Sequence, residues 1–235
     1  MSDEGKEISV EEKDLAGLSL VDRGLAIMRE KYGTGVGDGE TPLPYHNAVH
    51  VEDVLWAVRL MCDLAIKKGK MSPEEKILAL IAAAYHDVEQ RQSSWVNEEM
   101  SAQEAAAAMA AEKVFSAEEI EKVRSMILAT KVFFDQEGVM RQMITDDYLS
   151  QMMADADLST LGASADLCWN RTIRILKELK NAVSLSEDDI REFAAEQALF
   201  IQSHPFHTPE ARLLFPNAGK NIEFCWKKSN LVLVA

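Results

Sequence analysis

The sequence predicts an all-α protein built as a single helical bundle, and three observations predict it. Hydroxyl residues followed three positions later by an acid, the pattern of a capping box, occur at Ser9, Ser116 and Ser186. Proline follows a capping hydroxyl at Ser72 and at Thr208, where the missing N–H of the first helical residue costs nothing. Between these starts, apolar residues recur three and four positions apart, as they do on one face of a helix.

The elements follow from these signals in chain order. Apolar stripes such as the one from Leu18 to Met28, combined with the caps, predict helices near 18–32, 46–68, 73–87, 97–114, 117–131, 146–157, 165–181, 187–203, 209–215 and 218–228. Glycines at alternate positions over 33–39 predict a flexible loop before the second helix, and residues 133–145 an irregular connection. The last residues, 231–235, form the longest β-rich segment.

The domain organisation predicted is simple. We expect residues 1–17 to be a flexible N-terminal segment, because they are polar and acidic. We expect residues 18–235 to form one domain, since no internal repeat and no linker rich in Pro and Ser divides them.

Charge and composition exclude several partners. Against 25 Lys and Arg, the 235 residues include 39 Asp and Glu, so the net charge is −14. Such a charge repels nucleic-acid and membrane phosphates at long range, so we expect neither partner. The three cysteines are far apart and fit a reducing compartment. Without a signal peptide or an apolar stretch of about 18 residues, the expected setting is the cytoplasm and no membrane.

The residues that carry chemistry lie in three short motifs. They are the pair His46 and His50, the doublet His86-Asp87, and the pair Asp155 and Asp157. Imidazole nitrogens and carboxylate oxygens are ligands for borderline divalent ions. Two His and two Asp carry a charge of about −2, which one divalent cation neutralises, and leave positions open for water. Spacing alone does not choose between Asp155 and Asp157.

The order of these motifs resembles that of the HD-domain metal-dependent phosphohydrolases, all-α proteins named for the His-Asp doublet. The segment 45–54 also resembles the signature of cyclic-nucleotide phosphodiesterases, a branch of the same superfamily. A group of bacterial predicted HD phosphohydrolases is similar over about residues 45–162. The shared elements are YHNxxH, the doublet, Asn-Glu-x-x-Ser-Ala at 97–102, Ala-Thr-Lys at 129–131 and Asp-x-Asp-Leu-Ser-x-Leu-Gly at 155–162.

The resemblance implies an HD-type helical bundle with the metal site between helices and its core at about residues 45–162. The metal ligands it implies are His50, His86, Asp87 and Asp157, which favours Asp157 over Asp155. Members with two metals carry further histidines, but here Gln90 stands four residues after His86. We therefore expect one divalent ion, from the set Mn²⁺, Fe²⁺, Co²⁺, Ni²⁺, Zn²⁺ and Mg²⁺.

Two residues of these motifs are candidates for catalysis. His46, one helical turn before His50, is a candidate general acid that protonates the leaving-group oxygen, and helix capping is the alternative role. A carboxylate beside it must favour the protonated imidazole, and Glu98, Glu104 or Asp53 is available for this. Asp87 would orient the attacking water as well as hold the metal.

Four further residues lie close to the motifs. Glu98 and Glu104 are candidate catalytic carboxylates that orient a ligand or the water, and support of the helix N-terminus is the alternative. Gln90 and Lys131 are candidates for substrate binding, and a solvated charge is the alternative for Lys131.

Together these observations predict a metal-dependent phosphohydrolase that cleaves a small phosphomonoester or phosphodiester, in particular a nucleotide, with a metal-activated water. The alternative is a catalytically weak domain that binds metal and nucleotide as a sensor, which the missing histidines favour. The partner expected is a small phosphorylated substrate, and a homodimer is compatible with the sequence.

Overall fold

The computed structural model describes residues 9–34, 43–90, 96–134, 140–143 and 145–230. Its helices are α1 (Val10–Tyr32), α2 (Ala48–Lys67), α3 (Pro73–Tyr85), α4 (Asn97–Glu112), α5 (Ala117–Leu128), α6 (Tyr148–Asp157), the 3₁₀ turn η1 (Ser159–Gly162), α7 (Ala165–Lys180), α8 (Glu187–Ser203), α9 (Pro209–Leu214) and α10 (Ala218–Ser229). Two short strands, β1 (Val132–Phe134) and β2 (Met140–Gln142), complete the described part. The all-α class predicted from the sequence is confirmed.

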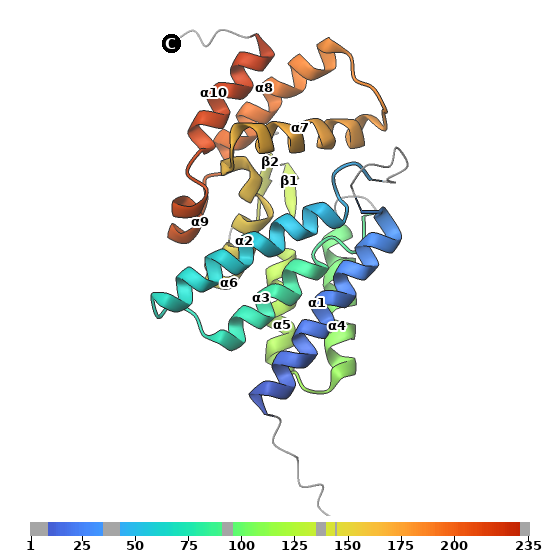
Figure 1. Cartoon of the computed structure of the whole chain (residues 1–235), viewed down its shortest axis with the longest axis vertical. Coiled ribbons are helices and arrows are strands. Elements are labelled where there is room, and N and C mark those ends of the chain that lie inside the picture. The colour runs from blue at the N-terminus through green and yellow to red at the C-terminus, as the bar shows by residue number, and fades with distance from the viewer. Residues whose placement is uncertain (1–8, 35–42, 91–95, 135–139, 144, 231–235) are drawn as a thin grey trace, which may run out of the picture.

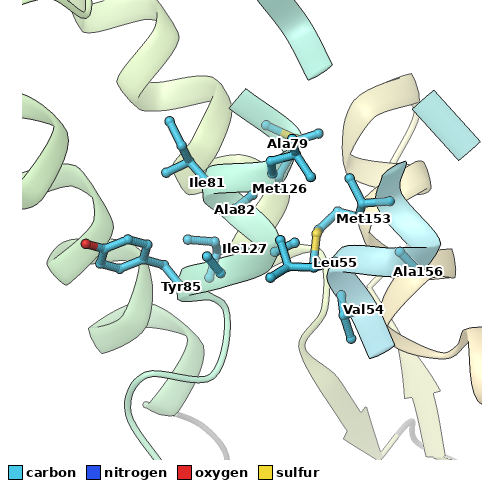
Figure 2. Packing of buried hydrophobic residues seen from close by; sticks show 14 of the residues in the cluster. Val54, Leu55, Ala79, Ile81, Ala82, Tyr85, Met126, Ile127, Met153 and Ala156 are labelled. Carbon is cyan, nitrogen blue, oxygen red and sulfur yellow. The ribbon is translucent and has the colours of Figure 1, made fainter. Parts of the chain in front are cut away.

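Helix α3 lies at the centre of the larger of two hydrophobic clusters. All of its residues from 78 to 85 are buried, and α1, α2 and α5 pack around it. Figure 2 shows Ala79, Ile81 and Ala82 of α3 among side chains of α2, α5 and α6. The small residues along α3 allow this close packing, which fixes the position of the turn at its C-terminal end.

A second layer covers one end of this bundle. Helices α7, α8 and α10 share a smaller cluster of their own, formed by Leu161, Cys168, Ala198, Ile201 and Cys225. Figure 1 shows α7, α8 and α10 together at one end of the molecule, with β1 and β2 between α7 and α2 in this view. Arg171 of α7 binds Asp53 of α2, with Nε 2.7 Å from Oδ2, so an ion pair joins them.

The first helix begins earlier than the sequence predicted. Instead of starting at residue 18, α1 starts at Val10, so residues 10–17 are not a flexible segment. The capping box explains the difference, because Glu12 N donates to Ser9 Oγ at 3.2 Å and Ser9 N donates to Glu12 Oε2 at 3.0 Å. Lys13 also pairs with Glu119 of α5 at 2.8 Å. Residues 1–8 lie outside the described part of the chain.

Two short antiparallel strands, β1 and β2, lie where an irregular connection was predicted. Val132 pairs with Gln142 and Phe134 with Met140. The amide of Gln142 donates to the Ala154 carbonyl of α6 at 3.2 Å, which anchors β2 to the bundle. The prediction was wrong because a three-residue strand is too short to show alternation.

Several other predictions fall outside what the structure describes. These are the glycines of the loop before α2, apart from Gly33, and the β-rich residues 231–235. Across the described ranges, no helix combines the length and the apolarity that crossing a bilayer requires.

The contact between α1 and α3 gives a stability prediction. A Cβ added at Gly24 would lie 2.7 Å from the Ala84 carbonyl oxygen and 2.9 Å from the Ala84 Cβ. We expect Gly24→Ala to lower the free energy of unfolding by about 1–3 kcal/mol, because this overlap outweighs the gain in helix propensity. Chemical denaturation measures the change.

Gly219 in α10 is the matched control, because a Cβ added there meets nothing within 4 Å. Gly219→Ala should leave the free energy of unfolding unchanged or raise it by up to about 1 kcal/mol. A Gly24→Ala protein as stable as the Gly219→Ala protein would show that α1 and α3 are not in close contact.

Candidate metal centre

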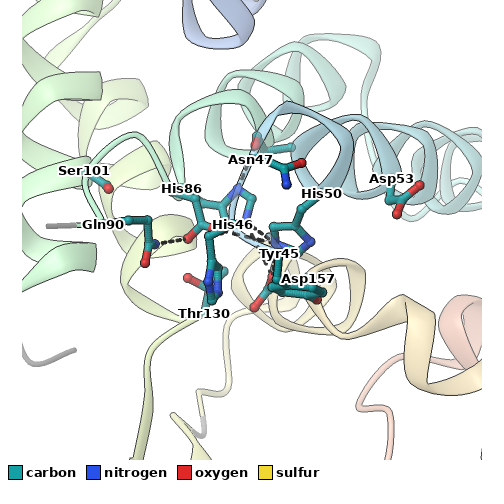
Figure 3. Close-up of polar contacts among 12 residues, drawn as sticks. Tyr45, His46, Asn47, His50, Asp53, His86, Gln90, Ser101, Thr130 and Asp157 are labelled. Atoms are coloured by element: carbon teal, nitrogen blue, oxygen red, sulfur yellow. Dashed lines mark hydrogen bonds and ion pairs between the residues drawn. The ribbon is translucent and has the colours of Figure 1, made fainter. Parts of the chain in front are cut away.

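Three segments that are distant in the sequence bring the candidate ligands together (Figure 3). His50 lies in the first turn of α2, while His86 and Asp87 directly follow α3 and Asp157 ends α6. The start of α2 is fixed by Asn47, whose side chain accepts from Val49 N at 3.0 Å and donates to the Leu43 carbonyl at 2.9 Å.

Four side-chain atoms face one another at this point. His50 Nε2 lies 3.2 Å from His86 Nε2, 3.2 Å from Asp87 Oδ2 and 3.1 Å from Asp157 Oδ1. His86 Nε2 lies 3.2 Å from Asp87 Oδ2 and 3.4 Å from Asp157 Oδ1. Ligand atoms about 2.0–2.2 Å from one tetrahedrally coordinated ion are about 3.3–3.6 Å apart, so the contacts among His50, His86 and Asp87 fit a single ion. Asp157 Oδ1 lies at a similar distance from both imidazoles.

The hydrogen bonds of these residues also fit a metal ion. His86 Nδ1 lies 2.8 Å from the Ala83 carbonyl oxygen and donates to it, which leaves the lone pair on Nε2 of the neutral ring. Apart from the Nε2 atoms of His50 and His86, each 3.2 Å away, Asp87 Oδ2 is buried without a hydrogen-bond partner. A buried carboxylate oxygen without a partner is unfavourable, and a cation would satisfy it. The buried group His50, His86 and Asp87 can hold a metal ion.

The pKa values show how strongly these groups interact. Burial alone lowers the pKa of His86, but the negative charges of Asp87 and Asp157 and the bonds to them raise it well above its ordinary value. The pKa of His50 is also raised, because its bonds to Asp157 and Asp87 outweigh its burial. The same interactions hold the pKa of Asp87 well below its usual range against the effect of burial. The cluster thus attracts positive charge.

The two aspartates of α6 have different roles. Asp157 Oδ1 faces both imidazoles, as described above. Asp155 faces away from them and accepts hydrogen bonds from His207 N and Thr208 N at 2.7 Å each, and from Thr208 Oγ1 at 2.6 Å. Asp155 therefore fixes the turn before α9, and Asp157 is the aspartate that lies at the cluster.

His46 is held by a residue that the sequence did not reveal. Its Nδ1 lies 2.5 Å from Glu178 Oε1, and the backbone N–H groups of Tyr45 and His46 donate to Glu178 Oε2 at 2.8 and 3.0 Å. Burial lowers the pKa of His46, but the bond to Glu178 and the charges of Asp87 and Asp157 raise it to about 9. The carboxylate expected beside His46 is Glu178 of α7.

The three residues suggested from the sequence for that place lie elsewhere or bind other groups. Asp53 pairs with Arg171, as described above. Glu104 is 3.5 Å from Lys31 and does not line the cavity at the metal centre. Glu98 lines that cavity, where burial and the charge of Asp87 raise its pKa. The carboxylate bound to His46 is that of Glu178.

Gln90 and Glu98 lie beside Asp87. Gln90 Nε2 donates to Asp87 Oδ1 at 2.7 Å and its Oε1 accepts from Asn97 Nδ2 at 3.3 Å, so Gln90 orients the carboxylate. Burial, together with the charge of Asp87, raises the pKa of Glu98 to about 7. Glu98 Oε2 is buried and lacks a hydrogen-bond partner, which agrees with burial as the main cause of this raised pKa.

Lys131 and the remaining histidines are placed away from the cluster. Lys131 Nζ lies 2.5 Å from Glu99 Oε1, and Lys131 does not line the cavity, so the structure does not bring this predicted phosphate ligand to the site. His204 Nδ1 donates to the Phe200 carbonyl at 2.7 Å. The backbone of His207 binds Asp155, and neither histidine reaches the four facing atoms.

A cavity of about 840 Å³ opens at the cluster. Asp87, Asp157 and His46 form part of its wall, with Tyr45 beside them. The ring of Tyr45 packs on His50, with ring centroids 4.6 Å apart. This volume is within the range of about 300–1,000 Å³ of sites that bind small molecules.

Comparison with models of known protein families gives no match for this chain, and comparison with curated proteins also gives none. Sequence reasoning missed Glu178 and Arg171, which lie on α7 outside every motif and carry no local signal of their position.

The geometry predicts one divalent ion per chain. We expect elemental analysis of metal-replete protein to give about one equivalent, and His86→Ala to lose it, since one of four facing atoms is removed. His207→Ala is the control, because only the backbone of His207 binds Asp155. Two equivalents per chain, or none, would contradict the prediction.

The pair His46 and Glu178 predicts a pH dependence in the metal-free protein. Because folding raises the pKa of His46 from 6.5 to about 9, the pair stabilises the fold fully below about pH 6.5. This contribution is lost as the pH rises through about 9. The His46 side chain is 32% exposed, so solvent screens part of the effect.

An NMR titration of the His46 ring measures this pKa directly. Glu178→Gln should lower it towards its ordinary value. Glu196→Gln, which removes another carboxylate of the cavity wall, should leave it near the wild-type value. A His46 ring that titrates near 6.5 in the metal-free wild type would refute the pairing.

Proposed function

We propose that this protein is a metal-dependent phosphohydrolase that cleaves a small phosphate ester. The observation that carries the proposal is that Asp87 and Asp157, which line a cavity, each lie 3.1–3.4 Å from both buried imidazoles, His50 and His86. A divalent cation held there would acidify water and polarise a phosphoryl oxygen. The resemblance of the same residues to the HD-domain phosphohydrolases supports the assignment.

The residues around the cluster can carry the proton transfers of such a reaction. His46 lies one turn from His50, with the ring centroids 5.8 Å apart, and its Nδ1 is engaged by Glu178. The proton on its other ring nitrogen is then available to a leaving oxygen in the cavity. Glu98, whose pKa burial raises to about 7, lines the same cavity and can accept a proton there.

A single ion fits the residues better than two. The position where a further histidine would stand is occupied by Gln90, whose amide is already bonded to Asp87 and Asn97. Amide groups are weak ligands for borderline divalent ions compared with imidazole. One cation with two carboxylates and two imidazoles leaves no net charge on the set.

The proposal predicts metal-dependent turnover with a specific dependence on the leaving group. Wild-type protein should hydrolyse both a nitrophenyl phosphate and an alkyl phosphate when a divalent metal is added. His46→Ala should keep its metal but lower kcat for the alkyl ester by about 10²–10⁴-fold, because the alkoxide needs a proton. The loss should be much smaller for the nitrophenyl ester.

His86→Ala and His207→Ala are the matched controls. His86→Ala should bind no metal and turn over neither ester, and His207→Ala should bind metal and keep full activity. An equal loss on both esters for His46→Ala would assign that residue a positional role. Binding of metal and phosphate by the wild type with no turnover of any ester would instead favour a sensor module.

A further inference from the structure

The cavity at the metal centre continues well beyond it. Its wall includes Asp87 and Asp157 at one end and extends between α7 and α8, where Ile175, Phe193 and Phe200 line it. We call this extension, between α7 and α8, the apolar arm. The arm and the cluster belong to one continuous cavity, so a single small molecule can occupy both.

The arm offers few partners to a polar ligand. The hydroxyl of Thr172 already donates to the Cys168 carbonyl at 2.9 Å. Gln197 and Gln202 of α8 are amide side chains of the wall, of which Gln197 is buried and Gln202 exposed, and one buried amide cannot satisfy the several donors and acceptors of a nucleobase and its ribose. Leaving such groups without partners in a buried site reduces affinity strongly.

The charges of the wall also disfavour a polyphosphate. Arg171 is the one Lys or Arg among the described residues of the wall, and its guanidinium is bound by Asp53. Glu98 and Glu196 add acidic groups to the wall besides the two ligand aspartates. One cation at the cluster, with His46, suits one phosphate group rather than a chain of them.

The outer part of the arm is apolar and exposed. Leu179 of α7 is 70% exposed and Leu199 of α8 is 55% exposed, and both line the cavity. Large apolar side chains that surround the opening of a cavity mark a site for an apolar ligand. Hydrocarbon buried there would remove both the ligand and these side chains from water.

We propose that the apolar arm binds the hydrocarbon part of a phosphate monoester whose phosphate group lies at the metal centre. The proposal rests on the phosphohydrolase function for the place of the phosphate. It names the substrate class as the monophosphate of an apolar alcohol instead of a nucleotide. The arm itself is a property of α7 and α8 and binds hydrocarbon independently of catalysis.

Binding of alkylphosphonates, which are not hydrolysed at the P–C bond, tests the proposal. Calorimetry on zinc-loaded wild-type protein with the methyl, butyl, hexyl and octyl compounds should show tighter binding by roughly threefold per added methylene. Octylphosphonate should also bind more tightly than adenosine monophosphate. An affinity independent of chain length, or a preference for the nucleotide, would overturn the proposal.

Two substitutions locate the binding site. Ile175→Asn within the arm and Leu199→Asn at its opening should each weaken octylphosphonate by about tenfold while methylphosphonate stays within about twofold. Leu213→Asn is the control, because Leu213 is 63% exposed and lies on α9, outside the cavity wall. Leu199 is more than half exposed, so Leu199→Asn remains informative if Ile175→Asn fails to fold. Equal losses in Leu213→Asn would overturn the assignment.

A second series separates the arm from the proposed function. Octanol, hexanol and butanol carry no phosphonate, so their binding to metal-free protein depends on the arm alone. If the protein fails to bind metal but binds these alcohols with the same dependence on length and on Leu199, the arm stands and the function fails. If metal and methylphosphonate bind but neither series depends on length, the arm fails and the function stands.

Discussion

Two buried imidazoles lie 3.2 Å apart, with a carboxylate 3.1–3.4 Å from both of them on each of two segments, and the rest of the structure serves this arrangement. Buried carboxylates are unfavourable without positive charge beside them. Protons on His50 and His86 can supply that charge, which is why their pKa values are raised, and so can a divalent cation. Metal and protons therefore compete for the same place, as they do in most imidazole and carboxylate sites.

The arrangement is held from two directions. The packed α3 helix positions the doublet His86-Asp87, because that helix is buried along most of its length and cannot shift without creating cavities. From the other layer, two residues of α7 bind the segment that contains α2. Glu178 binds the backbone just before α2, and Arg171 binds Asp53 farther along α2. The cavity is lined by residues of both layers, with Asp87 and Asp157 from one and the apolar residues of α7 and α8 from the other.

The sequence predicted correctly the features that depend on residues close together in the chain, such as helix ends. The capping box at Ser9 marked the start of α1 correctly, although the apolar stripe suggested a start at residue 18. The His and Asp motifs named the residues that converge, since each ligand sits at a helix end that the pattern could place. Glu178 was missed, and neither Glu104 nor Lys131 lines the cavity, because spacing along one helix does not show which distant helix packs against it.

The wide separation of the converging segments along the chain has a consequence for synthesis. A growing chain that has been translated as far as α5 contains His50, His86 and Asp87 but not Asp157, and α7 with Glu178 follows still later. Domains tend to fold from the N-terminus during translation, and distant segments meet only after long loops close. The α1–α5 intermediate would therefore carry an incomplete cluster with one carboxylate, and the site would mature only when α6 and then α7 have left the ribosome.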